Sequence, residues 1–198
     1  MKLKTQTTAP AFSAESLSGK TVSLEDYKNK NLLVKFYRFA TCPVCNLHLR
    51  NFVKQYDELK KEGLEVVIIY HSPKWRMEKN FPQDIPFELL SDPGKNIFRK
   101  YGVESSLAGM FSWRLMRDYM LALKAGYPTG MLSHDGGVMG HPADFIINKQ
   151  GKIVFAHYGK NYADSLSIKQ VIDVLRKIQP ESKIEEKTQQ ANKELTTA

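Results

Sequence analysis

Cysteine is scarce in this sequence: there are two among 198 residues, Cys42 and Cys45, with two positions between them. A structural disulfide framework needs more cysteines at wider spacing, so the small disulfide-stapled folds are excluded. A zinc site needs two further ligands, yet the five histidines include no pair separated by three to five residues. We therefore expect no metal and no organic cofactor. What remains is a close dithiol, which suits redox exchange.

Long apolar runs are also absent. No stretch reaches eighteen apolar residues, so no membrane-spanning helix is expected. The N-terminal residues Met1–Pro10 are polar and lack the apolar core of a signal peptide. We accordingly expect a cytoplasmic location and no membrane partner.

Acidic residues are fewer than basic ones: 21 Asp and Glu stand against 29 Lys and Arg, a formal net charge of +8. The basic residues are scattered, without a run of five or more, and no zinc-finger or RNP signature is present. This distribution is typical of a solvated basic surface, so no nucleic-acid partner is expected. The length suffices for one domain with a sizeable core.

Two short apolar runs with a helical pattern between them form the first half of the predicted fold. Asn31–Arg38 and Leu64–Tyr70 read as buried strands, and Pro43 to about Glu62 reads as a helix that ends at Gly63. This order predicts a parallel βαβ unit. Before it, Ser18-Gly19-Lys20 supplies the turn of a hairpin.

The second half predicts an antiparallel hairpin followed by a helix. Ala143–Asn148 and Lys152–His157 read as strands, and Ser165–Ile178 carries an apolar stripe at helical spacing. Between the halves, His71–Pro86 reads as loop with room for one helical turn, Phe87–Ser91 as a short strand and Asp92–Gly102 as a helix. Leu107–Lys124 reads as a helix whose apolar stripe is Phe111, Leu115, Tyr119 and Leu123, and Tyr127–Gly140 reads as loop. Helices on both faces of a mixed sheet make a three-layer α/β domain over residues 1–178, followed by a polar, mobile tail over residues 179–198.

The dithiol stands where the first buried strand ends and a helix begins. The free N–H groups and the dipole at a helix start stabilise a thiolate, which is the nucleophilic form of cysteine. We therefore expect Cys42 to be the exposed attacking thiol and Cys45, one turn further in, to be the buried resolving thiol. Pro43 suits the first helical turn, and Arg38 is a candidate cation for stabilising the thiolate.

Several short stretches match a known pattern: Ala9–Phe12, Ser18–Leu24, Val34–Tyr37, the C-P-V-C motif, Pro142–Asn148, Gly151–Ile153 and Ala156–Gly159. Together and in this order they resemble the AhpC/TSA or redoxin proteins, the peroxiredoxin-like branch of the thioredoxin superfamily. The resemblance implies a thioredoxin-like α/β/α sandwich with a mixed central sheet. It also implies a dithiol oxidoreductase that reduces protein disulfides or peroxides and is itself reduced again by a cellular thiol. A homodimer is compatible with this reading.

The resemblance gives His141 and Pro142 a place beside the dithiol. Thioredoxin-like proteins carry a cis proline at the start of the strand facing the dithiol, and His141-Pro142 stands at the matching position. We therefore expect a cis bond before Pro142, so that the backbone of His141 faces the substrate.

Two departures from the peroxiredoxin pattern bear on the substrate. Typical peroxiredoxins carry P-x-x-x-(T/S)-x-x-C, whereas here Arg38 stands seven residues and Cys42 three residues before Cys45, with Thr41 next to Cys42. They also carry an arginine ahead of the late strand, where this chain has His141. The sequence thus displays a dithiol for disulfide exchange more plainly than a peroxide pocket.

Two other classes of function stay open at this point. The dithiol could serve a redox sensor or a binding module that uses the thioredoxin-like fold without catalysis. Alternatively, the helix over Leu107–Lys124, which mixes large apolar and basic residues, could form a lid or a partner surface rather than simply pack on the core.

Overall fold

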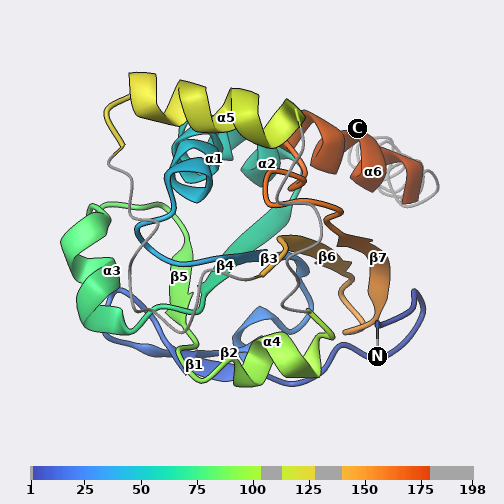
Figure 1. Ribbon diagram of the computed structural model, residues 1–198. Helices are drawn as coiled ribbons and strands as arrows, with labels where there is room; N and C mark the ends of the chain where they lie inside the picture. Colours follow the sequence, from blue (N-terminus) through green and yellow to red (C-terminus); the bar gives the residue numbers. More distant parts are fainter. Residues whose placement is uncertain (1, 104–112, 128–139, 179–198) are drawn as a thin grey trace, which may run out of the picture.

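A five-stranded mixed sheet lies at the centre of the computed structural model, which describes residues 2–103, 113–127 and 140–178 (Figure 1). The strand order is β5-β4-β3-β6-β7. The strands are β3 (Asn31–Tyr37), β4 (Leu64–Tyr70), β5 (Glu88–Ser91), β6 (Ala143–Ile147) and β7 (Ile153–Tyr158). Strands β3, β4 and β5 run parallel, whereas β6 and β7 join as antiparallel neighbours. The βαβ unit and the late hairpin predicted from the sequence are both confirmed.

Helices and a small hairpin cover the two faces of this sheet (Figure 1). One face carries α1 (Pro43–Lys54), α2 (Tyr56–Lys61) and α6 (Ile168–Ile178), with α5 (Trp113–Lys124) packed outside α1. The other face carries α4 (Asn96–Lys100) and the hairpin of β1 (Ser13–Glu15) and β2 (Thr21–Ser23), followed by a 3₁₀ turn over Leu24–Tyr27. The short helix α3 (Lys74–Asn80) lies beside the edge strand β5. This is the predicted three-layer α/β arrangement.

Strand β3 runs through the middle of the domain and leads directly to the dithiol. All seven of its residues are buried, because helices or the hairpin cover both faces of the sheet. Its side chains alternate between two apolar clusters: Leu33 and Tyr37 face α1, while Val34 and Phe36 face α4. The end of this strand is therefore held rigidly by the core on both sides.

One residue of β3 breaks this apolar pattern, because Lys35 is fully buried on the α1 face. Its ammonium pairs with Asp144, the residue directly opposite on β6, and donates to the carbonyl of Leu166 at 3.1 Å. Asp144 also accepts from the N–H of Leu166 at 2.9 Å. The pair thus joins two central strands to the segment before α6, and its partners offset the cost of burying two charges.

The structure differs from the prediction at three elements. The helix predicted from Pro43 to about Glu62 is interrupted at Gln55, where the Gln55 N–H bonds to the carbonyl of Phe52, three residues back, at 3.3 Å. The loop predicted over His71–Pro86 contains the seven-residue helix α3. In α5, Leu123 is 36% exposed, because the helix is turned so that Asp118 and Ala122 are its buried residues.

Some predictions fall on residues outside the described ranges: the tail over residues 179–198, the helix over residues 107–112, and most of the loop over residues 127–140. Within the described ranges, every helix is too short or too polar to cross a membrane.

The buried ion pair generates a stability prediction. Lys35→Met leaves Asp144 charged, buried and without its cation, so the free energy of unfolding should fall by about 3–5 kcal/mol. Lys35→Met/Asp144→Leu should recover much of that loss, because no unpaired charge remains. Urea unfolding followed by circular dichroism measures both variants. Equal losses in the single and double variants would contradict this account of the pair.

Candidate active site

Cys42 and Cys45 lie at the start of α1, as the sequence predicts. Cys42 is the N-cap, with extended backbone angles, and its carbonyl accepts the first helical hydrogen bond from the Asn46 N–H at 3.0 Å. Pro43 occupies the first helical position, where its missing N–H removes no hydrogen bond. Cys45 is then the third helical residue, one turn along from Cys42.

The turn between β3 and α1 is pinned from two directions. The Ala40 N–H donates to the hydroxyl of Ser72 at 2.8 Å, and the side-chain amide of Asn46 donates to the carbonyl of Ala40 at 3.0 Å. Ser72 is itself tied to β5, because its carbonyl accepts from the Ser91 hydroxyl at 2.8 Å. The neighbouring strands therefore fix the backbone that presents Cys42.

The two sulfurs form a reduced pair in direct contact. The Cys45 thiol lies 2.8 Å from the Cys42 sulfur and donates a hydrogen bond to it. The Cys45 N–H also points at this sulfur, at 3.4 Å, in the geometry of a helix cap. The Arg38 guanidinium lies on another side, with Nη1 4.0 Å from the sulfur. Cys42 thus sits where donors and a positive charge converge.

These contacts separate the two cysteines electrostatically. Burial raises the pKa of Cys42, but the Cys45 thiol, the Arg38 charge and backbone N–H groups together lower that pKa from 9.0 to about 7. Burial raises the pKa of Cys45 well above its ordinary value, and both the hydrogen bond it donates and the charge on Cys42 act in the same direction. The geometry therefore makes Cys42 the thiolate and Cys45 the thiol that donates to it.

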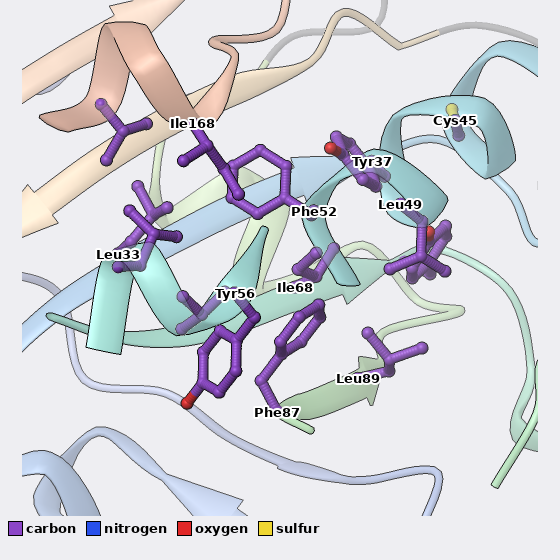
Figure 2. Packing of buried hydrophobic residues seen from close by; sticks show 14 of the residues in the cluster. Leu33, Tyr37, Cys45, Leu49, Phe52, Tyr56, Ile68, Phe87, Leu89 and Ile168 are labelled. Atoms are coloured by element: carbon purple, nitrogen blue, oxygen red, sulfur yellow. The ribbon is translucent and has the colours of Figure 1, made fainter. Parts of the chain in front are cut away.

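The exposure predicted for Cys42 is wrong. Cys42 is 1% exposed and Cys45 is 4% exposed, so the outer cysteine is no more accessible than the inner one. The reason is that the apolar cluster under α1 continues around the dithiol; Figure 2 shows Cys45 at its margin near Tyr37 and Leu49. A substrate larger than a few atoms needs a local opening of the chain to reach either sulfur.

The structure brings Arg38 to the dithiol and adds a residue that the sequence does not reveal. Arg38 is 7% exposed, and its guanidinium carbon lies 4.0 Å from the ring centre of Tyr162 and 5.0 Å from that of Phe39. Tyr162 lies between β7 and α6, far from the motif in sequence. A single aromatic residue in a polar loop carries no periodic signal, which is why sequence analysis missed it.

The other predicted site residues lie near this group with different roles. His141 contacts the Tyr162 ring edge-on at 5.5 Å between ring centres. The predicted cis bond before Pro142 is wrong: the bond is trans. Pro142 directly precedes β6, and its carbonyl accepts from the Gly159 N–H at 2.8 Å. Thr41 is half-buried in the turn before Cys42. A substrate-facing role for Thr41, His141 or Pro142 stays a prediction.

Metal ligation has no geometric support at this site. In the part of the chain that the structure describes, no group of three or more His, Cys, Asp or Glu side chains is arranged to hold an ion. The dithiol is therefore surrounded by hydrogen-bond donors and one guanidinium, which suit a thiolate.

Comparisons with known proteins agree with this geometry. The model of the AhpC/TSA family matches residues 5–156. Chloroplastic peroxiredoxin Q of Populus jackii is 34% identical over 116 residues, which are 58% of this chain and 54% of that protein. The reduced 2-Cys peroxiredoxin of Plasmodium vivax aligns with a TM-score of 0.63 at 20% identity, over 88% of this chain and 96% of that one. The peroxidoxin BcpB of Mycobacterium tuberculosis aligns with the same TM-score at 17% identity, over 90% and 97%.

The structural neighbours define the class of fold: it is a thioredoxin-like α/β fold with a mixed central sheet. The family match then identifies the chain itself, which belongs to the AhpC/TSA family. The chain spans about half the length of the curated relatives it matches, such as the 54% covered in the poplar protein.

The polarised dithiol generates a titration prediction. In reduced protein, the far-ultraviolet absorbance of thiolate should rise with a midpoint near pH 7, because Cys42 loses its proton there. Cys42→Ser should remove this step and leave a single titration at high pH from Cys45. If the step near pH 7 remained in Cys42→Ser and disappeared in Cys45→Ser, the thiolate would be Cys45, which would contradict our assignment.

Proposed function

We propose that the protein is a dithiol oxidoreductase that reduces hydroperoxides, with Cys42 as the attacking thiolate and Cys45 as the resolving thiol. The observation that carries this proposal is the contact between the two sulfurs at 2.8 Å, with the pKa of Cys42 lowered to about 7. Near neutral pH this gives one nucleophilic sulfur and one protonated sulfur within bonding reach.

The chemistry balances in three steps. The Cys42 thiolate attacks one peroxide oxygen, the O–O bond breaks, and the departing alkoxide takes a proton from water, leaving Cys42 as a sulfenic acid and releasing an alcohol. The Cys45 thiol then attacks the Cys42 sulfur, which forms the disulfide and releases water. Two thiols of an external reductant finally exchange with this disulfide and restore the dithiol.

Size favours a peroxide over a protein as the oxidant. The Cys42 sulfur is almost completely buried, so a hydroperoxide can reach it through a small fluctuation, whereas a protein disulfide needs a much larger opening. The relatives named above as peroxiredoxins support the same choice. The reductant is expected to be a cellular thiol, and formation of a homodimer and a cytoplasmic location stay predictions.

A protein disulfide is the second candidate substrate, and a specific observation favours it. Counted back from Cys45, the proline and hydroxyl positions of the peroxiredoxin pattern hold Arg38 and Cys42. Counted back from Cys42, the attacking thiol proposed here, they hold Lys35 and Phe39, so the residues that shape a peroxide pocket are missing in both registers. A redox sensor without turnover would use the same dithiol. Rates with defined substrates separate the three.

We predict that wild-type protein consumes hydrogen peroxide and an organic hydroperoxide faster than it reduces the disulfides of insulin, when each is measured with an excess of a dithiol reductant. Cys42→Ser should lower peroxide consumption by orders of magnitude, since the nucleophile is removed. Without the reductant, Cys45→Ser should consume one equivalent of peroxide and stop at the Cys42 sulfenic acid, which a sulfenic-acid trapping reagent and mass spectrometry detect.

The outcomes divide the candidates cleanly. Faster reduction of insulin than of either peroxide would overturn the peroxidase proposal in favour of disulfide exchange. Oxidation of one dithiol per chain to the Cys42–Cys45 disulfide, without repeated turnover, would overturn both enzyme proposals and support a redox sensor. Undiminished peroxide consumption by Cys42→Ser would remove Cys42 from the reaction altogether.

A further inference from the structure

Arg38 is the only group near Cys42 that brings a full positive charge within 4.0 Å of the sulfur among the described residues, and two aromatic rings flank it. Its guanidinium carbon lies 4.0 Å from the ring centre of Tyr162, close enough for strong attraction between the cation and the ring face. Both side chains are buried, Arg38 at 7% and Tyr162 at 5% exposed, so water screens this contact little. The stack therefore constrains where the guanidinium can lie.

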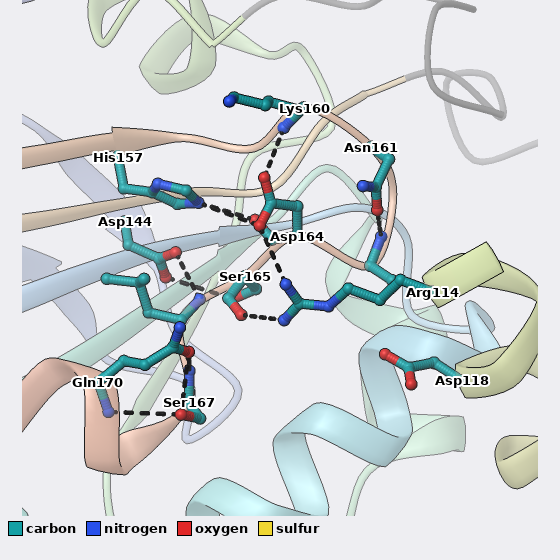
Figure 3. A network of polar contacts seen from close by, with 12 residues as sticks. Arg114, Asp118, Asp144, His157, Lys160, Asn161, Asp164, Ser165, Ser167 and Gln170 are labelled. Atoms are coloured by element: carbon teal, nitrogen blue, oxygen red, sulfur yellow. Dashed lines mark hydrogen bonds and ion pairs between the residues drawn. The ribbon is translucent and has the colours of Figure 1, made fainter. Parts of the chain in front are cut away.

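The loop that carries Tyr162 is itself held in place by Asp164 (Figure 3). The Asp164 carboxylate accepts from the Lys160 N–H at 2.8 Å and from the Arg114 guanidinium at 3.3 Å. Its carbonyl lies 3.0 Å from Nε2 of His157 on β7. These contacts connect the loop to β7 and to α5, so that Tyr162 is presented on a rigid support.

The edge of the Tyr162 ring is supported by His141. The two rings meet nearly at right angles, with centres 5.5 Å apart. Nδ1 of His141 donates to the carbonyl of Gly159 at 2.9 Å, which fixes the orientation of the imidazole. Gly159 must be small here, since a Cβ would lie 2.6 Å from the Asp164 carbonyl oxygen and 2.9 Å from Pro142. Tyr162 is thus in contact with both Arg38 and His141.

We propose that Tyr162 is a positioning residue, whose ring holds the Arg38 guanidinium beside the Cys42 sulfur. Arginine has a long, flexible side chain. Without the Tyr162 ring, which lies closer to the guanidinium than the Phe39 ring does, the guanidinium would spend part of its time turned away from the sulfur. This contact between the Tyr162 ring and the Arg38 guanidinium, called the clamp below, keeps the positive charge close to the Cys42 sulfur. This inference rests on the proposed function only in taking Cys42 as the reacting thiol.

Other titratable groups lie around the dithiol, Arg38 and Tyr162. They are Cys45, Tyr37, Tyr70, His71, Lys95 and His141. Burial raises the pKa values of Tyr37 and Tyr70 well above ordinary, so both stay neutral. Burial and the charge of Arg38 lower the pKa of Lys95. All six remain in each Tyr162 variant, and Tyr162→Phe also keeps the ring that His141 contacts.

The test is the thiolate titration of reduced, full-length protein, which needs no substrate. Arg38→Met should raise the midpoint by about one pH unit or more, a tenfold loss of thiolate near neutral pH. Tyr162→Leu, which keeps apolar bulk but removes the ring, should raise it by at least about half as much. Tyr162→Phe, which keeps the ring, should leave it unchanged. If the leucine variant does not fold, Tyr162→Met serves as the second ring-free variant.

A double variant shows whether Tyr162 acts through Arg38. In Arg38→Met protein, adding Tyr162→Leu should move the midpoint no further, because the clamp has no cation left to hold. A Tyr162→Leu midpoint equal to wild type, or full additivity with Arg38→Met, would overturn the clamp.

Failure of the clamp and failure of the proposed function give different results. If the protein consumes peroxide but the midpoint of its thiolate titration is the same in all Tyr162 variants, the clamp is refuted and the proposed function stands. A protein that turns over neither peroxide nor insulin, but whose midpoint follows the Tyr162 ring, refutes the function and supports the clamp.

Discussion

The charge on the Cys42 sulfur is the feature on which the rest of the site depends. A thiolate in an apolar surrounding is costly, and burial alone raises the pKa of both cysteines. The cost at Cys42 is offset by three donors that converge on one atom: the Cys45 N–H at the helix start, the Cys45 thiol, and the Arg38 guanidinium. At Cys45 the Arg38 charge and a backbone hydrogen bond are outweighed by burial, by the hydrogen bond that its thiol donates and by the charge on Cys42, so its pKa lies well above the ordinary value. Which of the two cysteines is the thiolate is therefore decided by which sulfur accepts these hydrogen bonds.

Lys35, Asp144 and Arg38 are charged residues buried in or beside the central sheet. Lys35 and Asp144 neutralise each other across β3 and β6 and share the Leu166 backbone, while Arg38 lies between aromatic rings and faces a sulfur that ionises easily. Both arrangements tie the central sheet to the segment between β7 and α6. That segment carries Tyr162, Asp164 and Leu166, so it links the core of the fold to the chemistry at the start of α1.

The parts of the fold that follow from local patterns were predictable. Buried strands such as β3 and β4, the helix start at Pro43 and the hairpin of β6 and β7 each have a signal within a few neighbouring residues, and the C-P-V-C spacing at a strand-to-helix junction located the dithiol. The features that depend on distant segments were not predictable. The burial of Cys42 depends on the apolar cluster that gathers around α1, and the stack of Tyr162 on Arg38 joins residues far apart in the sequence. The trans bond before Pro142 likewise has no signal in the neighbouring residues. Sequence could name Arg38 as a candidate cation but could not place it.

The most direct test of the central claim is a residue-specific one: the Cβ chemical shifts of Cys42 and Cys45, followed against pH by NMR in reduced protein labelled only at cysteine. The account predicts that the Cys42 signal titrates with a midpoint near pH 7, while the Cys45 signal keeps its thiol position until far higher pH. Titration of Cys45 before Cys42, or of both together at high pH, would contradict it.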